Sequence, residues 1–464
     1  MCGFIGFSGQ LAEKEAVLQR MMARIVHRGP DMGGAYVDED VALGFRRLSI
    51  LDLSEAGAQP MKSSDGNVVV TFNGEIYNFM ELRRELEEKG HHFHCHADTE
   101  VLVHGYEEWG TQLVYRLRGM YGFVIWDKAN RRLFGARDMF GIKPFYYSPL
   151  PDGKGLLFGS EIKGFLEHPL FQKAVNENAL LPYLTLQYSA TEETFFKGVY
   201  KLPAAHYFTY ENGKMEIQRY WDCKFAPKEQ SFDACADELD KTVHESVAAH
   251  RIADVKVGSF LSGGVDSSYI TACLMPDNTF SVGFDYNKFN ETNYAAELSE
   301  KLGVKNYRKL ITAEECFEAF PDIQYHMDEP QSNPSSVPLY FLAKLAREHV
   351  TVVLSGYNEF ELVREAFRLG VYDYMLKGDL NQWVLEELLD KGNAALISDV
   401  GCGALLCRAA LESAHMNVWI NTSSLSDRGD AARLEHEADT LLDCYSSRAG
   451  AVASEVSRRL RKEV

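Results

Sequence analysis

The stretch that most constrains the fold of this chain is Leu-Ser-Gly-Gly-Val-Asp-Ser-Ser at residues 261–268. It follows an apolar run that ends at Phe260, and a helix is expected from Asp266 onward. Gly263 and Gly264 let the backbone turn sharply and approach an anion, and the amides of the first helical turn point to the same place. The pattern therefore predicts a strand, a phosphate loop and a helix of an α/β domain.

The side chains of this loop suit a pyrophosphate. Ser262, Ser267 and Ser268 add hydroxyl donors, and Asp266 can hold a divalent cation. The loop is no Walker A motif, because no lysine follows the glycines. A Gly-Gly turn with helix-capping serines is the alternative. The loop resembles that of the ATP pyrophosphatases, and this resemblance implies cleavage of ATP between its α and β phosphates.

Composition limits the classes of partner. The chain has 464 residues, enough for two or three domains, and its formal charge of -19 argues against nucleic acid, since phosphate contacts need clustered Lys and Arg. Its apolar runs fall short of the ~20 residues of a membrane span, and its first residues do not read as a basic and then apolar leader. We therefore expect small-molecule substrates, no membrane and a cytoplasmic location.

Cysteine usage points to one special position. The nine cysteines are scattered and form no Cys-x-x-Cys pair, so neither a disulfide framework nor a zinc site is indicated. Removal of Met1 would place the thiol and the α-amine of Cys2 in one residue, and a free α-amine titrates near ~8, which is the logic of N-terminal nucleophile hydrolases. An inert second residue is the alternative. The apolar residues Phe4, Ile5 and Phe7 predict a buried strand beginning at the nucleophile.

Asn73 and Gly74 follow an apolar run at 68–72. An Asn side-chain amide beside a Gly backbone amide makes a workable oxyanion hole, because both can donate to one oxygen. An ordinary Asn-Gly hairpin turn is the alternative, because this dipeptide favours such turns.

Eight segments read together resemble the class II glutamine amidotransferases. They are residues 2–4, 27–31, 47–50, 57–60, 73–78, 98–100, 138–146 and 160–163. The match covers residues 2 to about 207 and implies an N-terminal nucleophile hydrolase αββα sandwich, to which the short apolar runs 123–126, 133–136 and 156–159 fit as strands. It also implies that Cys2 attacks the side-chain amide of glutamine, while Asn73 and Gly74 stabilise the oxyanion and ammonia leaves.

The same resemblance implies a set of glutamine-binding residues. Arg47 pairs with the substrate carboxylate, a bidentate task suited to a guanidinium, while Glu75 and Asp98 receive the α-ammonium. The full set that the resemblance implies for glutamine is Arg47, Leu48, Ser49, Ile50, Asn73, Gly74, Glu75 and Asp98.

A dense histidine cluster lies nearby, formed by His91, His92, His94, Cys95 and His96. Alternate residues of an extended segment point to opposite faces, so these side chains do not converge on one ion. We predict a solvated edge strand there and no metal site.

The second half reads as alternating strands and helices. A helix is predicted over 231–250, with Leu239, Val243 and Val247 facing the core. After the phosphate loop, a second parallel strand is predicted at 280–284. A crossover helix at 293–302 and the segments 326–340 and 350–356 complete the pattern, which resembles glutamine-hydrolysing asparagine synthetase up to residue 356.

That resemblance implies a reaction and a nucleotide site. The synthetase domain adenylates aspartate with ATP and Mg²⁺, and ammonia from the first domain attacks β-aspartyl-AMP to give asparagine, AMP and pyrophosphate. The residues it places at ATP are Leu261, Ser262, Gly263, Gly264, Asp266, Ser267, Val282, Ser355 and Gly356. Asp266 is the implied Mg²⁺ ligand, and such sites lie beyond the carboxyl ends of parallel strands.

After this point the chain departs from the family. A synthetase continues with an acidic, glycine-rich segment ending in Asp-Glu, whereas this chain reads Tyr-Asn-Glu-Phe at 357–360. Residues 352–377 resemble the closing third of a response-regulator receiver domain, with Ser355 and Lys377 at its hydroxyl and lysine positions. Its acceptor Asp and acidic pair would lie on earlier strands, which here belong to the synthetase, and Gly378 replaces the usual proline. We therefore predict no working phosphorylation switch.

Residues 381–464 carry no recognisable motif and predict helices, either packing helices or an oligomerisation helix that makes a homodimer. The domain bounds are 2–207 for the amidotransferase domain, 208–230 for a linker, 231–356 for the synthetase part, 357–380 for the receiver-like fragment and 381–464 for the tail. The resulting interpretation is an asparagine synthetase with an intact glutaminase half and a truncated synthetase half. A glutaminase that acts with a partner and a non-catalytic signalling or interaction protein remain alternatives.

Overall fold

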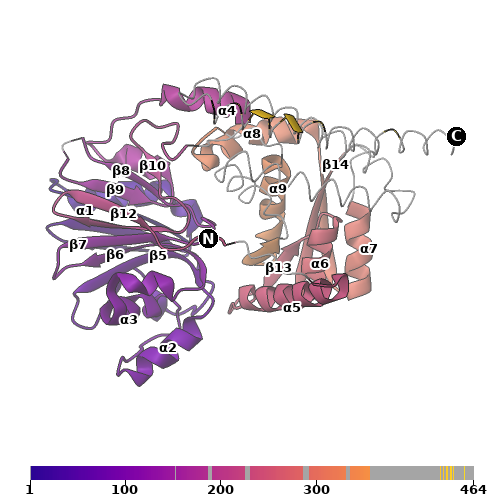
Figure 1. The fold of residues 1–464 in the computed structure, drawn as a ribbon, viewed down its shortest axis with the longest axis horizontal. Helices are drawn as coiled ribbons and strands as arrows, with labels where there is room; N and C mark the ends of the chain where they lie inside the picture. The colour runs from indigo at the N-terminus through magenta and orange to yellow at the C-terminus, as the bar shows by residue number, and fades with distance from the viewer. Residues whose placement is uncertain are drawn as a thin grey trace. The chain divides into compact units, whose positions relative to one another are not determined.

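The computed structural model describes residues 2–151, 153–186, 191–224, 230–285, 292–330 and 335–355, with isolated positions after 428 (Figure 1). The chain divides into one compact unit, Met1–Asn358, and a second, Glu359–Val464. The receiver-like segment 357–380 lies outside the described residues, as does the tail 381–464 apart from those isolated positions. Within the described residues, we find no helix with the length and apolar character needed to span a membrane.

Two six-stranded antiparallel sheets make up the part of the chain before residue 221. The strands are β1 (Gly3–Ser8), β2 (Met32–Val37), β3 (Val41–Arg47), β4 (Met61–Lys62), β5 (Val68–Ile76), β6 (Gly119–Asp127), β7 (Arg132–Arg137), β8 (Tyr146–Pro149), β9 (Leu156–Gly159), β10 (Tyr200–Lys201), β11 (His206–Glu211) and β12 (Lys214–Arg219). The first sheet has the order β10-β8-β9-β1-β3-β2 and the second β12-β11-β7-β6-β5-β4. The apolar runs 123–126, 133–136 and 156–159 lie in β6, β7 and β9, as the sequence predicts.

The helices of this part cover the outer faces of the two sheets. Helix α1 (Lys14–Arg24) packs on β1 and β3, while α3 (Glu100–Trp109) packs on β5 and pairs with α2 (Phe79–Glu88) (Figure 1). The remaining helical segments are η1 (Val26–Arg28), η2 (Glu55–Gly57), η3 (Gly110–Tyr115), η4 (Ile162–Glu167), η5 (Glu177–Ala179) and α4 (Leu180–Leu186). The inner faces meet in an aromatic core that includes Phe4, Phe45 and Phe158, each at most 1% exposed. The arrangement is a helix-sheet-sheet-helix sandwich.

One alternative and one prediction for this part are wrong. Asn73 and Gly74 form no hairpin turn, because they lie inside β5, where Asn73 is opposite Gly122 of β6. Residues 91–96 form no edge strand. Their backbone is held instead by a side chain, since the Glu100 carboxylate accepts hydrogen bonds from the amides of His94 at 2.8 Å and Cys95 at 3.0 Å.

The second half contains the parallel sheet that the sequence predicts. Its strands are β13 (Val257–Phe260), β14 (Asn278–Phe284), β15 (Lys305–Ile311) and β16 (Val352–Ser355), in the order β15-β14-β13-β16. All three neighbouring pairs are parallel. The helices are α5 (Phe232–His250), α6 (Val265–Leu274), α7 (Thr292–Leu302), α8 (Ala313–Met327) and α9 (Ser336–Ala346).

Helix α5 differs from expectation in how much of it is buried. Ser231 caps its N-terminus by accepting a hydrogen bond from the Ala234 amide at 3.2 Å. Val247 is 5% exposed and Val243 packs beside it, but Leu239 is 63% exposed, so its predicted core position is wrong. The helix packs on α6 and the short strand β13 through its C-terminal half, and its N-terminal half extends beyond them.

Candidate active site

Cys2 lies immediately before β1 in the first sheet. The Leu48 amide donates to its Sγ at 3.4 Å, and Sγ lies 3.4 Å from the Leu48 carbonyl oxygen. Burial raises the pKa of the thiol above its ordinary value, and the charge of Asp98 adds to the increase. The Leu48 backbone, the chain's N-terminal charge and Arg47 act in the opposite direction. A raised thiol pKa means that this cysteine needs a neighbouring base before it can act as a nucleophile.

Asn73 presents a buried donor. The residue is 1% exposed, and among the described residues its Nδ2 has no hydrogen-bond partner. Gly74 beside it has no room for a side chain, because a Cβ would lie 2.1 Å from the Met120 oxygen and 2.7 Å from Tyr121 Cα. A buried amide without a partner costs about 1–3 kcal/mol, which an acceptor on a bound molecule can recover. Since β5 contacts β1, this donor lies in the same part of the sandwich as Cys2.

Arg47 is the last residue of β3 and is held rigidly. It is 5% exposed, and its guanidinium donates to the carbonyl of Ser54 at 2.7 Å and to the carbonyls of Leu51 and Asp52. Gly57 makes room for it, because a Cβ there would lie 2.4 Å from one guanidinium nitrogen. A fixed guanidinium near the Cys2 thiol suits a carboxylate of the bound molecule.

Glu75 and Asp98 form an acidic pair in which Asp98 is buried and Glu75 is half-buried. Burial raises the pKa of Glu75 to about 6, although the positive charge of Lys143 opposes the increase. Burial also raises the pKa of Asp98, to about 7. The charge of Glu75 adds to this increase, and the hydrogen bond from the Ile76 amide at 2.8 Å opposes it. Two carboxyl groups that repel each other in a buried site favour a bound cation such as an ammonium group.

The segment after β3 lines the approach to Cys2. Leu48 contacts the thiol, and the Ser49 amide donates to the Asp31 carboxylate at 2.8 Å. The Ile50 carbonyl accepts a hydrogen bond from the Asp254 amide of the second half at 2.9 Å. The structure thus brings Leu48 to the Cys2 thiol, on which the charges of Arg47 and Asp98 also act, and places Ile50 in contact with the second half.

Several buried charged residues near Cys2 were missed by the residue-by-residue sequence reasoning. Lys143 is 3% exposed, and burial lowers the pKa of its ammonium to about 8 even though Glu75 opposes the decrease. Arg28, Glu161 and Lys163 are the others. All four lie within the motif segments 27–31, 138–146 and 160–163, so membership of those segments is the signal that could have found them.

The phosphate loop has the predicted backbone. Gly263 adopts a φ of 95°, which favours glycine, and α6 begins at Val265, one residue before the predicted start. No side chain caps α6, which argues against the capping-serine alternative. The Ser262 and Ser267 hydroxyls lie 3.0 Å apart, and Ser262 Oγ accepts a hydrogen bond from the Gly264 amide at 3.3 Å. The loop therefore leaves first-turn amides of α6 for an anion.

The other predicted nucleotide residues lie at the carboxyl ends of adjacent strands. Leu261 follows β13, its amide donates to the Phe280 carbonyl at 2.9 Å, and its own carbonyl accepts from Ser281 at 2.7 Å. Val282 lies further along β14, and Ser355 ends β16 opposite Phe260. Gly356 lies outside the described residues.

Asp266 and Ser268 lie in the first turn of α6, and Asp266 is exposed. It is the one carboxylate among residues 261–268, so the described loop offers Mg²⁺ a single charged ligand.

One group of potential metal ligands does occur among the described residues, in the first half of the chain rather than in the loop. His91, His104 and Glu107 place one ligand atom each within 4.8 Å of one another. His104 Nδ1 lies 2.9 Å from a Glu107 carboxylate oxygen, and although burial would lower the pKa of the imidazole, the Glu100 and Glu107 carboxylates raise it to about 9. A protonated imidazole is not a metal ligand, and the absence of a metal at the histidine cluster stays a prediction.

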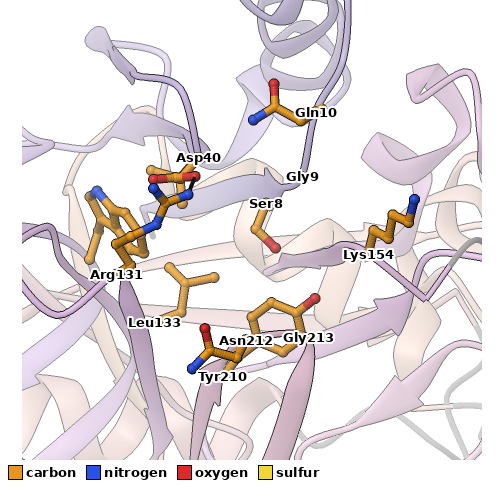
Figure 2. A pocket seen from close by; sticks show the side chains of 12 residues that line it. Ser8, Gly9, Gln10, Asp40, Arg131, Leu133, Lys154, Tyr210, Asn212 and Gly213 are labelled. Carbon is orange, nitrogen blue, oxygen red and sulfur yellow. Dashed lines mark hydrogen bonds and ion pairs between the residues drawn. The ribbon is translucent and has the colours of Figure 1, made fainter.

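A cavity of about 280 Å³ opens at the opposite end of β1 from Cys2. Figure 2 shows Arg131, beside Asp40, and Lys154 on opposite sides of it, with Ser8 between them. Because β1 rises about 3.3 Å per residue, roughly 17 Å separates Ser8 from Gly3. This cavity is therefore distinct from the predicted glutamine site.

Comparisons with known proteins match the two halves separately. The glutamine amidotransferase domain model matches residues 1–221 and the asparagine synthase model residues 238–358. A formiminotransferase-cyclodeaminase model matches residues 381–440, where the sequence analysis recognised no motif. The second match ends where the chain departs from the synthetase pattern.

Curated relatives extend over the same region. The chain is 40% identical over 374 residues to asparagine synthetase [glutamine-hydrolyzing] 1 of Bacillus subtilis, which covers 78% of this chain and 58% of the relative. It is 36% identical over 413 residues to a putative asparagine synthetase [glutamine-hydrolyzing] of Mycobacterium tuberculosis, with coverages of 81% and 63%. It is 32% identical over 390 residues to putative asparagine synthetase [glutamine-hydrolyzing] 2 of Methanocaldococcus jannaschii, with coverages of 77% and 74%. The chain thus spans less than two thirds of the first two relatives.

Proposed function

This chain belongs to the family of glutamine-hydrolysing asparagine synthetases. We propose that it hydrolyses glutamine at Cys2 to supply ammonia for ATP-dependent amidation of aspartate via β-aspartyl-AMP, with the second step impaired by truncation of the synthetase half. The observation that carries the first step is the buried Asn73 amide, which among the described residues has no partner for its donor. A donor kept buried and unpaired near a nucleophile is an oxyanion site before its substrate arrives.

The glutaminase step follows from these residues. Once Met1 is removed, the α-amine of Cys2 accepts the thiol proton, and the thiolate attacks the carbonyl carbon (Cδ) of the glutamine side-chain amide. The resulting oxyanion accepts hydrogen bonds from Asn73 Nδ2 and the Gly74 amide. The C–N bond then breaks, ammonia leaves with the proton from the α-ammonium, and a thioester to Cys2 remains. Water hydrolyses this thioester to glutamate and restores the thiol.

The buried charges position the substrate zwitterion. Arg47 holds the α-carboxylate, and Glu75 with Asp98 receives the α-ammonium. The ammonium would lower the pKa of both carboxyl groups, because it supplies the positive charge that their buried site lacks. Binding of glutamine therefore favours the ionised form of this pair.

The test is ammonia release from glutamine by the purified full chain. Cys2→Ala still permits removal of Met1 but lacks the thiol, so we expect it to abolish ammonia release. Cys273→Ala, a substitution in α6 of the second half, is the matched control and should keep the full rate. Undiminished hydrolysis by Cys2→Ala would exclude Cys2 as the nucleophile.

The second half supports nucleotide binding better than it supports catalysis. The loop at 261–268 and the carboxyl ends of β13, β14 and β16 lie at one edge of the parallel sheet, where they would bind ATP, whereas the asparagine synthase match stops at residue 358. Asp266 would hold Mg²⁺ together with oxygens of the triphosphate, and a single protein carboxylate positions that ion loosely. We propose that aspartate-dependent formation of AMP and pyrophosphate is weak or absent.

A glutaminase that acts with a partner is the second candidate, and it rests on Asp266 being the one carboxylate in the loop at 261–268. The test supplies free ammonia, aspartate, ATP and Mg²⁺ to the full chain and measures asparagine. Robust asparagine synthesis by this chain alone would show that its synthetase half is complete enough to act and would exclude the second candidate. A cytoplasmic location and a homodimer formed through the tail stay proposals that rest on the sequence.

A further inference from the structure

The segment 160–163 lies between the nucleophile strand and the second half. Ser160, which is fully buried, binds both sides of one residue of β1, since its Oγ accepts from the Phe4 amide at 3.1 Å and its amide donates to the Phe4 carbonyl at 2.9 Å. This contact fixes the strand two residues after Cys2. The next three residues of the segment make the contacts that lead away from it.

Arg28 connects this segment to Cys2 itself. Its Nε donates to the Cys2 carbonyl at 2.9 Å, and a second guanidinium nitrogen donates to Glu161 at 2.9 Å. Gly3 allows this close approach, because a Cβ at Gly3 would lie 2.7 Å from Arg28 Cδ. Glu161, which also lies 2.9 Å from His27 Nε2, therefore holds the guanidinium that holds the nucleophile's backbone.

Lys163 links Glu161 to the second half of the protein. Its ammonium lies 2.5 Å from Glu161 and 2.8 Å from Asp328, which ends helix α8. The other Asp328 oxygen accepts a hydrogen bond from the Ile162 amide at 2.7 Å. The Lys163 and Asp328 side chains are 4% and 5% exposed, so this is a desolvated ion pair between residues 165 apart in sequence.

The charges in this chain depend on one another. Burial would raise the pKa of Glu161, but the hydrogen bond from His27 and the charges of Arg28 and Lys163 lower it to about 2. Burial raises the pKa of Asp328, and Lys163 limits the increase. Removing one member of a buried ion pair leaves its partner uncompensated in a poorly polarisable environment, so the remaining groups must move or change protonation.

We propose that Lys163 and Asp328 are positioning residues for the Cys2 nucleophile and that they couple the position of α8 in the second half to the glutaminase step. The coupling rests on the glutaminase function proposed above. When α8 holds Asp328 against Lys163, Glu161 stays ionised and keeps Arg28 on the Cys2 carbonyl. When α8 shifts, Glu161 loses the support of one cation and Arg28 loosens its hold on the nucleophile.

A second ion pair provides a matched control. Lys201 lies 2.6 Å from Glu329, the residue after Asp328, and Glu329 also accepts a hydrogen bond from the Phe195 amide at 3.2 Å. The Lys201 and Glu329 side chains are 13% and 10% exposed. This pair also joins the two halves and is nearly as buried, but it leads to the Phe195 backbone rather than to Arg28.

The test compares glutamine hydrolysis by the full chain with Lys163→Met, Asp328→Asn, the double variant and Glu329→Gln. For Lys163→Met and Asp328→Asn we expect kcat to fall between about tenfold and a hundredfold, as small misplacements of reacting groups do, with KM within about twofold. The double variant should fall no further than the worse single variant, because both act through one contact. Glu329→Gln should stay within about twofold of the parent kcat.

Two further readouts separate positioning from simple loss of folding. Lys163→Met should add a new acidic limb to the pH profile of kcat, because Glu161 without Lys163 takes up a proton more readily. It should also increase the rate of Cys2 alkylation by iodoacetamide at least threefold, measured by peptide mass spectrometry, while Glu329→Gln leaves that rate unchanged.

An equal fall in kcat for Glu329→Gln, or an unchanged kcat and pH profile for Lys163→Met, would overturn the coupling. If the parent chain hydrolyses no glutamine, the proposed function fails, and the alkylation rates still decide whether these residues position Cys2.

Discussion

Replacement of Asn73 by alanine tests the oxyanion site in a way that separates activity from stability. Asn73 is 1% exposed and its Nδ2 has no partner among the described residues, so the free protein carries a buried donor whose desolvation is uncompensated. In the transition state the same donor would face a full negative charge. The substitution therefore removes an interaction that exists only during the reaction.

The expected loss of activity follows because Asn73 Nδ2 has a partner in the transition state and none in the free protein. Loss of one oxyanion donor typically lowers kcat by about 10²–10³-fold, or about 2.7–4 kcal/mol, and leaves KM nearly unchanged. For folding, relief of an unpaired amide returns about 1–3 kcal/mol, while loss of packing around β5 costs a similar amount. We therefore expect Asn73→Ala to be nearly inactive with a Tm within a few degrees of the parent protein.

Asn176→Ala is the matched control, because Asn176 is also buried but fully engaged. Its Nδ2 donates to the Thr194 carbonyl at 3.0 Å and its Oδ1 accepts from the Asn178 amide at 3.1 Å. This variant should lose about 1–2 kcal/mol of stability and keep kcat. The assay measures ammonia release and thermal unfolding for both variants. A change in KM alone for Asn73→Ala would refute its role in the oxyanion site.

Three further outcomes are expected. KM for glutamine should rise as pH falls from about 7 to about 6, because Asp98 and Glu75 then take up protons and lose their attraction for the α-ammonium; a flat KM would contradict this binding mode. In the free protein, burial raises the pKa of Asp98 from its ordinary value in an unfolded chain to about 7, so the contribution of Asp98 to stability should fall as pH rises toward 7. Urea titrations at pH 4.5 and 7 can detect this fall. Gly263→Ala should weaken ATP binding in calorimetry by about 1–2 kcal/mol without affecting glutamine hydrolysis, because a φ of 95° strains any residue with a Cβ. Equal ATP affinity of the variant and the parent would exclude this loop from the ATP site.

The sequence predicts much of the fold because many of its strands and loops are marked by patterns of neighbouring residues. Apolar runs mark β6, β7 and β9, and the glycine-rich loop falls where β13 meets α6. These local patterns do not predict the burial of a residue when the element that covers it lies elsewhere in the chain. The apolar face of α5 includes Leu239, but periodicity does not tell how far α6 and β13 extend beneath that face.

The same distinction explains why the turn alternative and the edge-strand prediction fail. The dipeptide Asn73-Gly74 favours a turn by itself, and its pairing with β6 keeps it extended. Alternation at 91–96 suggests a strand, but the Glu100 carboxylate takes the amides that a neighbouring strand would need.

The candidate site shows the same division. Cys2, Arg47, Asn73 and Asp98 lie in segments whose order along the chain identifies them. The ion pair of Lys163 with Asp328 has no local signature, because its two residues come from different halves and meet only in the folded chain.

The most direct measurement of the central claim is covalent labelling with a glutamine analogue that carries an electrophilic carbon in place of the side-chain amide, followed by peptide mass spectrometry of the full chain. We expect one stoichiometric adduct, on the N-terminal peptide that begins with Cys2 and lacks Met1, and we expect glutamine to protect against it. An adduct on another cysteine such as Cys95 or Cys273, or no adduct while ammonia is still released, would contradict catalysis by Cys2.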